Sequence, residues 1–446
     1  MLTRIEIDGF KTFENFELDL DPFCAVVGPN ASGKSNLFDA LRFISALVQS
    51  DIRTAMKNLR GEPEELFRIT PGKKSNQIRF AIEVLLPRNG ADAFGQKFSI
   101  SSLRLRYVLK IARRAGADGG VEGLFVDFEE CAPIKKGEDR SKFVKTATEN
   151  LYGRTRRPFI NMRDKGDAIE VRQDGPSKHG RPITLAIANA SRTALSTITT
   201  SEFPHLYALR EFLASIHFLQ IDPQAARRPS DRLSARDLAP DASNLATVLA
   251  RIQSETATTN RPHGALADIA SDLTSLIPSV RSIVLQDNER AREYAFDIKL
   301  SDDLSFSSRV ISDGTLRLLA LMTILNDPRR AGMLCFEEPE NGVHEGRMPQ
   351  LVELLRNSCS TSIYESDDHY FQILTNTHSP AVMNCLKGEE IIAADIITTI
   401  DPKTKIKTSK TRMRKGVVDS SDLISPERTL TRVEIDSLLR KTAGAA

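Results

Sequence analysis

The chain has 446 residues, of which 40% are hydrophobic and 27% are charged, and its formal net charge is +2. This length suffices for two or three packed units, and the near-neutral charge excludes a polycation that coats nucleic acid. No run approaches the ~20 apolar residues of a membrane helix, and the first residues lack the apolar core of a secretion signal. We therefore expect no membrane partner. The five cysteines form no CxxC pair, so we expect no zinc site, no disulfide framework and a cytoplasmic location.

The first part of the chain predicts two antiparallel strands, a buried strand, a loop and a helix. Apolar residues alternate around Ile5 and again around Leu18, as in half-buried strands. Phe23–Val27 is a continuous apolar run, which is typical of a strand buried on both faces. It ends at Gly28, and residues 37–43 then have helical spacing. Further strands are predicted at residues 78–85 and 103–111.

The pattern weakens between residues 112 and 200, which predicts an inserted or partly mobile lobe. Within it, residues 159–171 read as a hairpin that turns at Lys165 and Gly166. A second α/β section follows. Its predicted helices lie at 203–216, 243–256, 264–277 and 316–325, and its predicted strands at 283–285, 294–300, 332–336 and 371–375.

The segment Gly28-Pro-Asn-Ala-Ser-Gly-Lys-Ser35 matches GxxxxGK[ST], the phosphate-loop (P-loop) motif. Its backbone N–H groups cradle phosphate, its Lys reaches the β- and γ-oxygens, and its Ser hydroxyl coordinates Mg²⁺. A buried strand ends at the first Gly and a helix starts after the Lys, which is the context the motif requires. We therefore expect MgATP here. The expected binding residues are Gly28, Asn30, Ser32, Gly33, Lys34, Ser35 and Asn36.

Glu337 and Glu338 end the apolar strand predicted at 332–336. Carboxyl ends of such strands meet at the edge where a P-loop also lies. We expect Glu337 to contact Mg²⁺ with Ser35, and Glu338 to polarise the attacking water. The alternative is an acidic strand end that only faces solvent.

His378 follows the next buried strand, and Ser312-Asp-Gly-Thr315 precedes a helical run. His378 can hydrogen-bond and report the γ-phosphate, or it can be a structural donor. Ser312 can be an ordinary helix N-cap, or the helix start can bind a γ-phosphate from another subunit. Spacing alone leaves both pairs of alternatives open.

These motifs together resemble the ABC-type ATPase heads of the RecF/SMC/OLD group, and most closely the bacterial ATPases grouped as AAA_21. The resemblance covers roughly residues 1–110 and 220–400. It implies an α/β fold with a mixed sheet core, an antiparallel β N-terminal subdomain and an inserted α+β lobe. It is carried by Gly28–Asn36, Ser312-Asp-Gly-Thr-Leu-Arg317, Leu334-Cys-Phe-Glu-Glu-Pro-Glu-Asn-Gly-Val-His344 and Thr375-Asn-Thr-His-Ser-Pro380.

The resemblance implies a homodimer in which Ser312 and Gly314 of one copy complete the nucleotide site of the other. Three residues depart from the wider pattern: Asp313 where Gly is usual, Glu337 where Asp is usual, and Ala31 where many relatives have Gly. These departures predict slow turnover rather than loss of binding. Gln77 is a weak candidate for the family's Q-loop glutamine.

Members of this group include ATPases that serve in phage defence beside a nuclease. The resemblance therefore implies an ATP-clamped switch that drives or gates a separate effector, a nuclease or TOPRIM-like protein, in defence or DNA processing. Nucleic acid is a candidate partner because basic residues crowd two stretches. They are Arg154, Arg156, Arg157, Arg163, Arg172, Lys178 and Arg181, and Lys403, Lys405, Lys407, Lys410, Arg412, Arg414 and Lys415.

Three other functions are alternatives. A regulatory scaffold held together by ATP is compatible with the same motifs. A transporter's nucleotide-binding subunit is disfavoured by the degenerate signature and the central insertion. Intrinsic nuclease chemistry is disfavoured because Asp395, Asp401, Asp419 and Asp422 lack the Asp-x-Asp spacing of a TOPRIM metal site.

Four segments are predicted: an N-terminal ATPase lobe with the P-loop, an inserted lobe, a C-terminal ATPase lobe with the remaining motifs, and a basic tail. Stacking of heads into assemblies larger than a dimer is compatible with this layout. The segments span residues 1–111, 112–220, 221–400 and 401–446.

Overall fold

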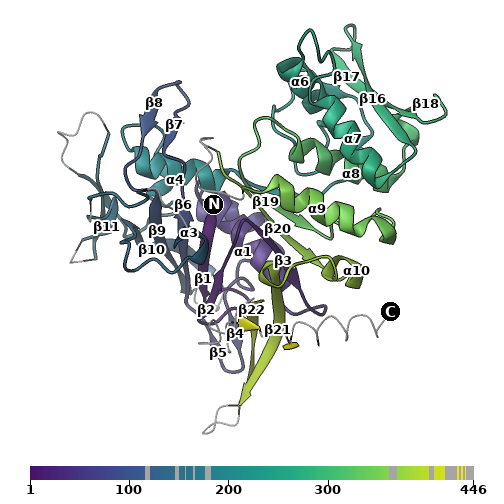
Figure 1. Cartoon of the computed structure of the whole chain (residues 1–446). Helices are drawn as coiled ribbons and strands as arrows, with labels where there is room; N and C mark the ends of the chain where they lie inside the picture. Colours follow the sequence, from purple (N-terminus) through teal and green to yellow (C-terminus); the bar gives the residue numbers. More distant parts are fainter. Residues whose placement is uncertain are drawn as a thin grey trace. The chain divides into compact units, whose positions relative to one another are not determined.

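The computed structural model describes residues 1–115, 121–145, 150–155, 157–163, 166–175, 182–360, 369–400, 406–416, 429–430, 433–434 and 437. Contacts divide the chain, traced in Figure 1, into two compact units. The first comprises Met1–Ile216, Ser360–Gln372 and Gly388–Asp436, and the second His217–Cys359, Ile373–Lys387 and Ser437–Ala446. The four segments predicted above stay a prediction. In the part of the chain that is described, no helix is long and apolar enough to cross a membrane.

An eight-stranded sheet dominates the first unit, and its strand pairs are antiparallel. The predicted N-terminal pairing is confirmed, since Ile5 lies opposite Leu18 on one side and Ile82 on the other. In sheet order the strands are β13 (Ile183–Ala186), β12 (Ala168–Val171), β11 (Ile160–Met162), β10 (Val121–Pro133), β9 (Arg104–Ala115), β6 (Gln77–Leu85), β1 (Leu2–Asp8) and β2 (Phe16–Asp19).

The weakly patterned middle of the chain supplies four of these strands. β10 pairs with β9 along its length, with two register shifts. The predicted hairpin is confirmed, because β11 and β12 pair from Ile160 opposite Val171. Gly166 has a φ of 67°, in the left-handed region that favours glycine, while Lys165 lies outside the described residues.

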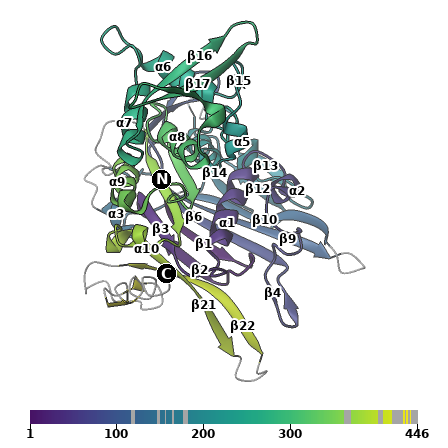
Figure 2. The same ribbon diagram turned by 90° about the vertical axis from the view of Figure 1, so that its right-hand side faces the viewer.

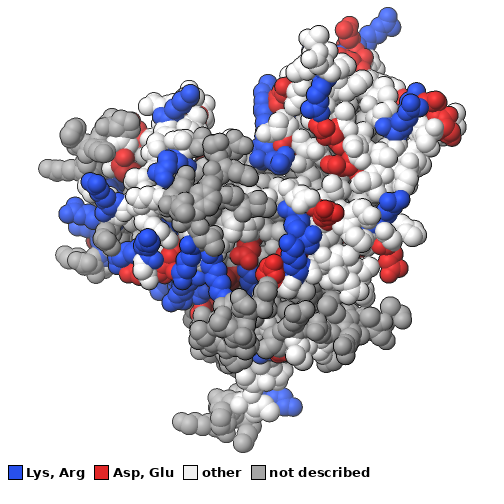
Figure 3. All heavy atoms as spheres, viewed as in Figure 1, with Lys and Arg blue, Asp and Glu red and all other residues white. Residues whose placement is uncertain are grey.

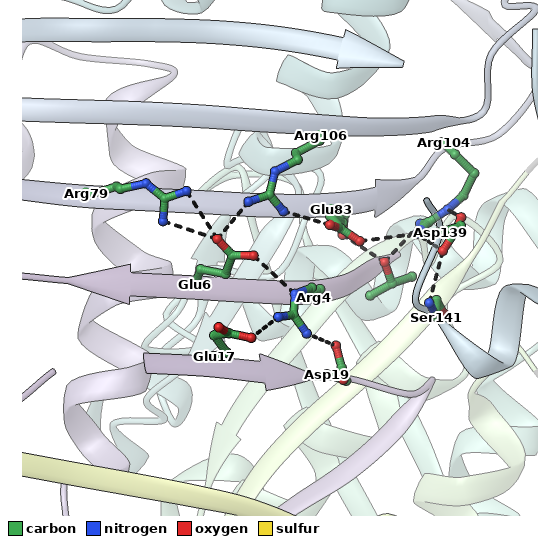
Figure 4. A network of polar contacts seen from close by, with 11 residues as sticks. Arg4, Glu6, Glu17, Asp19, Arg79, Glu83, Arg104, Arg106, Asp139 and Ser141 are labelled. Carbon is green, nitrogen blue, oxygen red and sulfur yellow. Dashed lines mark hydrogen bonds and ion pairs between the residues drawn. The ribbon is translucent and has the colours of Figure 1, made fainter. Parts of the chain in front are cut away.

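One face of this sheet carries a ladder of alternating charges (Figure 4). Arg104 is fully buried, and its Nε and Nη2 donate to the two carboxylate oxygens of Asp139 at 2.6 and 3.0 Å. Burial alone would raise the pKa of Glu6, but hydrogen bonds and charges from Arg106, Arg4 and Arg79 lower it to about 2. The ladder thus satisfies its charges internally rather than presenting one sign to a ligand.

A second group of strands in the first unit begins with β3 (Phe23–Val27), which is buried throughout, as predicted. β3 pairs in parallel with β21 (Ile391–Ile400), which forms a long antiparallel hairpin with β22 (Lys407–Gly416) (Figure 2). β22 also pairs with β23 (Thr429–Leu430). The remaining elements of the unit are α1 (Lys34–Leu47), α2 (Ile52–Lys57), α3 (Lys142–Lys145), α4 (Pro204–Ala214), β4 (Ile69–Thr70), β5 (Lys73–Lys74), β7 (Asn89–Ala91), β8 (Lys97–Ser99) and the 3-10 turns η1 (Leu195–Thr197) and η4 (Gly388–Glu390).

β14 (Ile216–Leu219), β19 (Gly332–Glu337) and β20 (Phe371–Thr377) are neighbours in that order, and all of their residues except Ile216, Phe371 and Gln372 belong to the second unit. A separate antiparallel sheet consists of β15 (Ser230–Asp231), β17 (Glu293–Leu300), β16 (Val280–Asn288) and β18 (Ser305–Ser307). The predicted strands and helices of this section are all present. Its helical elements are α5 (Pro223–Ala226), α6 (Leu245–Thr256), α7 (Leu266–Leu276), η2 (Ser308–Val310), α8 (Asp313–Leu325), η3 (Glu345–Arg347), α9 (Met348–Ser358) and α10 (Pro380–Met383).

Candidate nucleotide-binding site

The P-loop connects the buried strand β3 to the start of α1, and its two glycines occupy positions that no other residue can take. Gly28 has a φ of 151°, and a Cβ there would lie 2.3 Å from the carbonyl oxygen of Ala394 on β21. Gly33 has a φ of 93°, and a Cβ there would lie 2.1 Å from Oγ1 of Thr411 on β22. Both close approaches are far inside van der Waals contact, so the loop can turn only with glycine at these points.

Polar groups of the loop converge where the motif places phosphate. The Lys34 side chain is buried, and its Nζ donates to the carbonyl oxygens of Gly28 and Pro29, each at 2.7 Å. Ser32 Oγ is buried and has no hydrogen-bond partner within the described residues. Asn30 is exposed and Ser35 is half-buried at the first turn of α1. A buried hydroxyl without a partner is costly unless a ligand satisfies it, and phosphate oxygens can do so.

Asn36 and two threonines that were not predicted, Thr12 and Thr411, support the P-loop through side-chain hydrogen bonds. Asn36 Nδ2 donates to Thr12 Oγ1 at 2.9 Å, and Thr12 Oγ1 lies 2.7 Å from Thr411 Oγ1. Thr411 is the residue against which Gly33 packs. The side chain of Asn36 therefore acts here as a support for the loop, and its predicted contact with nucleotide stays a prediction.

The two predicted acidic residues in the second unit are held by Asn376 of β20. The Glu338 N–H donates to both the backbone oxygen and the side-chain oxygen of Asn376, each at 3.1 Å. Asn376 Nδ2 lies 3.3 Å from Glu337 Oε2, the acceptor. Strand ends β19 and β20 are thereby locked together, with both carboxylates half-buried at the same edge.

The loop after Glu338 is also constrained. Glu338 has a φ of 53°, which is uncommon for a residue other than glycine, and Asn341 Nδ2 donates to its Oε2 at 2.8 Å. Glu340 Oε1 accepts a 2.6 Å hydrogen bond from Thr377 Oγ1, whereas its buried Oε2 has no partner among the residues described. His378, next along the chain, is exposed. Asn376 and Glu340 were not predicted. The signal for Asn376 is the run of polar residues 375–377 inside a fully buried strand. The signal for Glu340 is indirect, because it is a partner of Thr377 in that run.

Ser312 caps α8, because its Oγ accepts a hydrogen bond from the Thr315 N–H at 3.2 Å. The capping interpretation is therefore confirmed, and it leaves Ser312 exposed at the helix start. Gly314 packs against Gly342 of the loop that follows Glu338: a Cβ on Gly314 would lie 2.8 Å from Gly342 Cα. The signature and the acidic loop thus touch through two glycines.

The donor set fits MgATP. Mg²⁺ prefers oxygen ligands and is usually held by one or two carboxylates together with phosphate oxygens. The Ser35 hydroxyl of the first unit is a donor of that kind, and so, taken by itself, is the Glu337 carboxylate of the second unit. Within the first unit, the P-loop presents an ammonium group, a helix start and a buried hydroxyl, which suit the phosphates of ATP.

The predicted basic clusters are partly neutralised. In β22, Arg412 pairs with Asp395, Arg414 with Glu434 and Lys415 with Asp21. Figure 3 shows basic and acidic side chains close together on the face it displays. Arg156, Lys178, Arg181, Lys403 and Lys405 lie outside the described residues. The weak Q-loop candidate Gln77 donates from its Nε2 to Asp127 Oδ2 at 2.6 Å within the eight-stranded sheet.

Comparison with known proteins agrees with this geometry. Residues 23–384 match the family model AAA_21, described as "AAA domain, putative AbiEii toxin, Type IV TA system". The chromosome partition protein Smc of Methanocaldococcus jannaschii is 43% identical over 172 residues, which are 38% of this chain and 13% of that protein. The replication and repair protein RecF of Lactobacillus gasseri is 29% identical over 94 residues, 21% of this chain and 25% of that protein.

These relatives are matched over a minor part of their own length. A crystal structure of an Smc head bound to the C-winged helix domain of ScpA aligns with a TM-score of 0.50 and 15% identity, over 93% of this chain and 97% of that one. This likeness shows that the fold is that of an SMC head. Since the family model spans most of the chain, this protein belongs to the AAA_21 family of ATPase domains, related to SMC and RecF heads.

Proposed function

We propose that the chain binds MgATP and hydrolyses it slowly. The observation that carries this proposal is the P-loop between β3 and α1, with its two obligatory glycines, the Lys34 ammonium group and the buried free hydroxyl of Ser32. Lys34 would bind the β- and γ-phosphate oxygens, and Ser35 and Glu337 would hold Mg²⁺. The bound metal would neutralise charge on the phosphates. Glu338 would polarise the attacking water, and His378 would hydrogen-bond the γ-phosphate.

The same proposal includes an ATP-dependent homodimer. Ser312 and Gly314, at the exposed start of α8, would bind the γ-phosphate held by a second copy. Slow turnover is proposed from the three departures from the family's pattern, Ala31, Asp313 and Glu337. Ala31 takes a φ of 63°, where glycine would be unstrained.

The decisive comparison uses Lys34→Ala and Glu338→Gln. Lys34→Ala should bind ATP at least 100-fold more weakly and remain monomeric, because the phosphate-binding ammonium is gone. Glu338→Gln should bind ATP normally, lose hydrolysis and accumulate as a dimer. Light scattering after gel filtration with and without ATP measures both. The exposed Lys57 and Glu345 provide matched controls as Lys57→Ala and Glu345→Gln. Wild-type assembly and hydrolysis in both site variants would refute the proposal.

We further propose that the ATP-clamped dimer gates a separate effector, a nuclease or TOPRIM-like protein, in defence or DNA processing. The family's description as a toxin-system domain supports this placement. The ion pairs of Arg412, Arg414 and Lys415 reduce the charge that β22 offers to DNA, although Lys407 is exposed, and this reduction supports action through a partner. The purified chain should therefore hydrolyse ATP but leave plasmid DNA intact. DNA cleavage by the wild type that is lost in Lys34→Ala would contradict the proposal that a separate effector carries the nuclease activity.

A regulatory scaffold is the second candidate, and the same variants separate it from a switch. In a switch, effector output requires cycling, so Glu338→Gln should lock the output in one state. In a scaffold, ATP binding suffices, so Glu338→Gln should support output as well as the wild type does.

A further inference from the structure

Asp313 introduces a negative charge where the proposed function needs to attract one. It is the first residue of α8, directly after Ser312, and 64% of its side chain is exposed. A carboxylate at a helix start stabilises the helix by about 0.3–1 kcal/mol. The same carboxylate, however, would stand beside the γ-phosphate that the helix start is proposed to bind, and like charges repel.

Arg227 lies against this carboxylate. Its Nη2 donates to Asp313 Oδ1 and also to the backbone oxygen of Ile311, the latter at 2.8 Å. The Arg227 side chain is only 16% exposed, so its charge is less screened than that of a surface arginine. The contact joins residues 86 positions apart in the sequence.

The backbone around Arg227 fixes where its side chain can reach. Asp222 caps the short helix α5 by accepting from the Gln224 N–H at 2.9 Å, and Arg227 is the residue that ends this helix. The Arg227 carbonyl oxygen accepts from Ser308 Oγ at 2.8 Å. Arg227 therefore contacts both ends of the segment 308–313. Its backbone oxygen binds Ser308, and its guanidinium binds Ile311 and Asp313.

We propose that Arg227 is a positioning residue of the signature, which holds residues 311–313 in place and neutralises Asp313 so that Ser312 can meet an anion. The inference rests on the proposed function, because it needs a γ-phosphate at Ser312. A purely structural ion pair is the competing explanation. The two explanations make different predictions for the double variant. If Arg227 acts by neutralising Asp313, removing the Asp313 carboxylate makes Arg227 unnecessary. If the ion pair is only a structural contact, removing Asp313 as well does not restore what the loss of Arg227 took away.

The test measures the ATP concentration at which half of the protein is dimeric, in the Glu338→Gln background. Arg227→Ala should raise this concentration at least tenfold, because Asp313 is left unpaired beside phosphate. Arg227→Ala with Asp313→Asn should return to within about threefold of the parent. The defect of Arg227→Ala should also shrink with added salt, which screens the exposed carboxylate. Arg228→Ala, at the exposed neighbouring position, is the matched control and should behave like the parent.

Other outcomes overturn the inference without touching the proposed function. If Lys34→Ala abolishes dimerisation while Arg227→Ala dimerises like the parent, or if Asp313→Asn fails to rescue it, Arg227 has no such role. Asp313→Asn alone keeps the test decisive should Arg227→Ala not fold. In this variant the positive charge of Arg227 has no carboxylate beside the phosphate, so half-dimerisation should require no more ATP than in the parent. A tenfold higher ATP concentration at half-dimerisation would contradict the inference. Failure of Lys34→Ala to affect dimerisation would instead refute the proposed function.

Discussion

The contact between Gly314 and Gly342 allows a sharp prediction, because it joins the signature to the loop that follows Glu338. In Gly342→Ala the new Cβ would lie 2.4 Å from Gly314 Cα, about 1 Å inside normal contact. Both neighbours are backbone, so one segment must move by about that distance. The φ of 94° at Gly342 adds about 1–2 kcal/mol of backbone strain. A displacement of about 1 Å at a reacting group can cost about 100-fold in rate.

We therefore expect Gly342→Ala to lower the ATP hydrolysis rate by roughly 10- to 100-fold while ATP binding at the P-loop changes little. Steady-state phosphate release gives the rate, and a fluorescent ATP analogue gives the affinity. The control is Gly346→Ala in the 3-10 turn η3 that follows this loop, where the added Cβ would meet only the His344 ring, at 3.4 Å. Equal hydrolysis rates in the two variants would show that the glycine contact does not couple signature and loop.

Three further predictions concern binding and stability. Gly33→Ala should abolish ATP binding in calorimetry, because its Cβ would overlap Thr411; affinity within threefold of wild type would contradict this. Asp139→Asn should lower the free energy of unfolding by about 3 kcal/mol, since it removes the charge that Arg104 meets with two hydrogen bonds and leaves, among the described residues, only Glu83, at 3.8 Å; a loss below 1 kcal/mol in urea unfolding would refute it. Burial raises the pKa of Glu129 to about 7, above its unfolded value near 4.5, so the fold favours the protonated form. Its stabilising effect should be complete below pH 4.5 and fall by about 3 kcal/mol as the pH rises to 7, and Glu129→Gln should flatten this slope.

The P-loop could be predicted from the sequence because its determinants are local. The buried strand, the two glycines and the following helix all lie within residues 23–47, and each has its own composition signal. The N-cap role of Ser312 is local for the same reason, since its acceptor serves an N–H three residues away. The chemistry of short, contiguous segments is visible without the fold.

The hairpin β21–β22 was not predicted, because β22 reads Lys-Thr-Ser-Lys-Thr-Arg-Met-Arg-Lys-Gly and lacks apolar alternation. Its polar side chains are accommodated by partners elsewhere, as when Arg412 pairs with Asp395 across the hairpin. Alternation of apolar residues indicates a strand that packs on an apolar core. It gives no signal for a strand that is held by ion pairs and backbone hydrogen bonds. The sequence therefore predicted a separate basic tail from residue 401 and no strand within it.

Asn376 and Arg227 were not predicted, because the residues that they contact lie 39 and 86 positions away in the sequence. Two residues that depart from the family's pattern, Glu337 and Asp313, each contact a polar partner from another segment of their own unit: Asn376 and Arg227. A longer carboxylate arm at Glu337 needs a donor that orients it, and an extra charge at Asp313 needs a counter-charge. Each departure is thus one half of a pair, so restoring the common residue alone would leave the other half unsatisfied. Reverting Asp313 to glycine, for example, would leave the guanidinium of Arg227 without its carboxylate at the helix start, a loss of a stabilising contact that is separate from the ATP requirement for dimerisation.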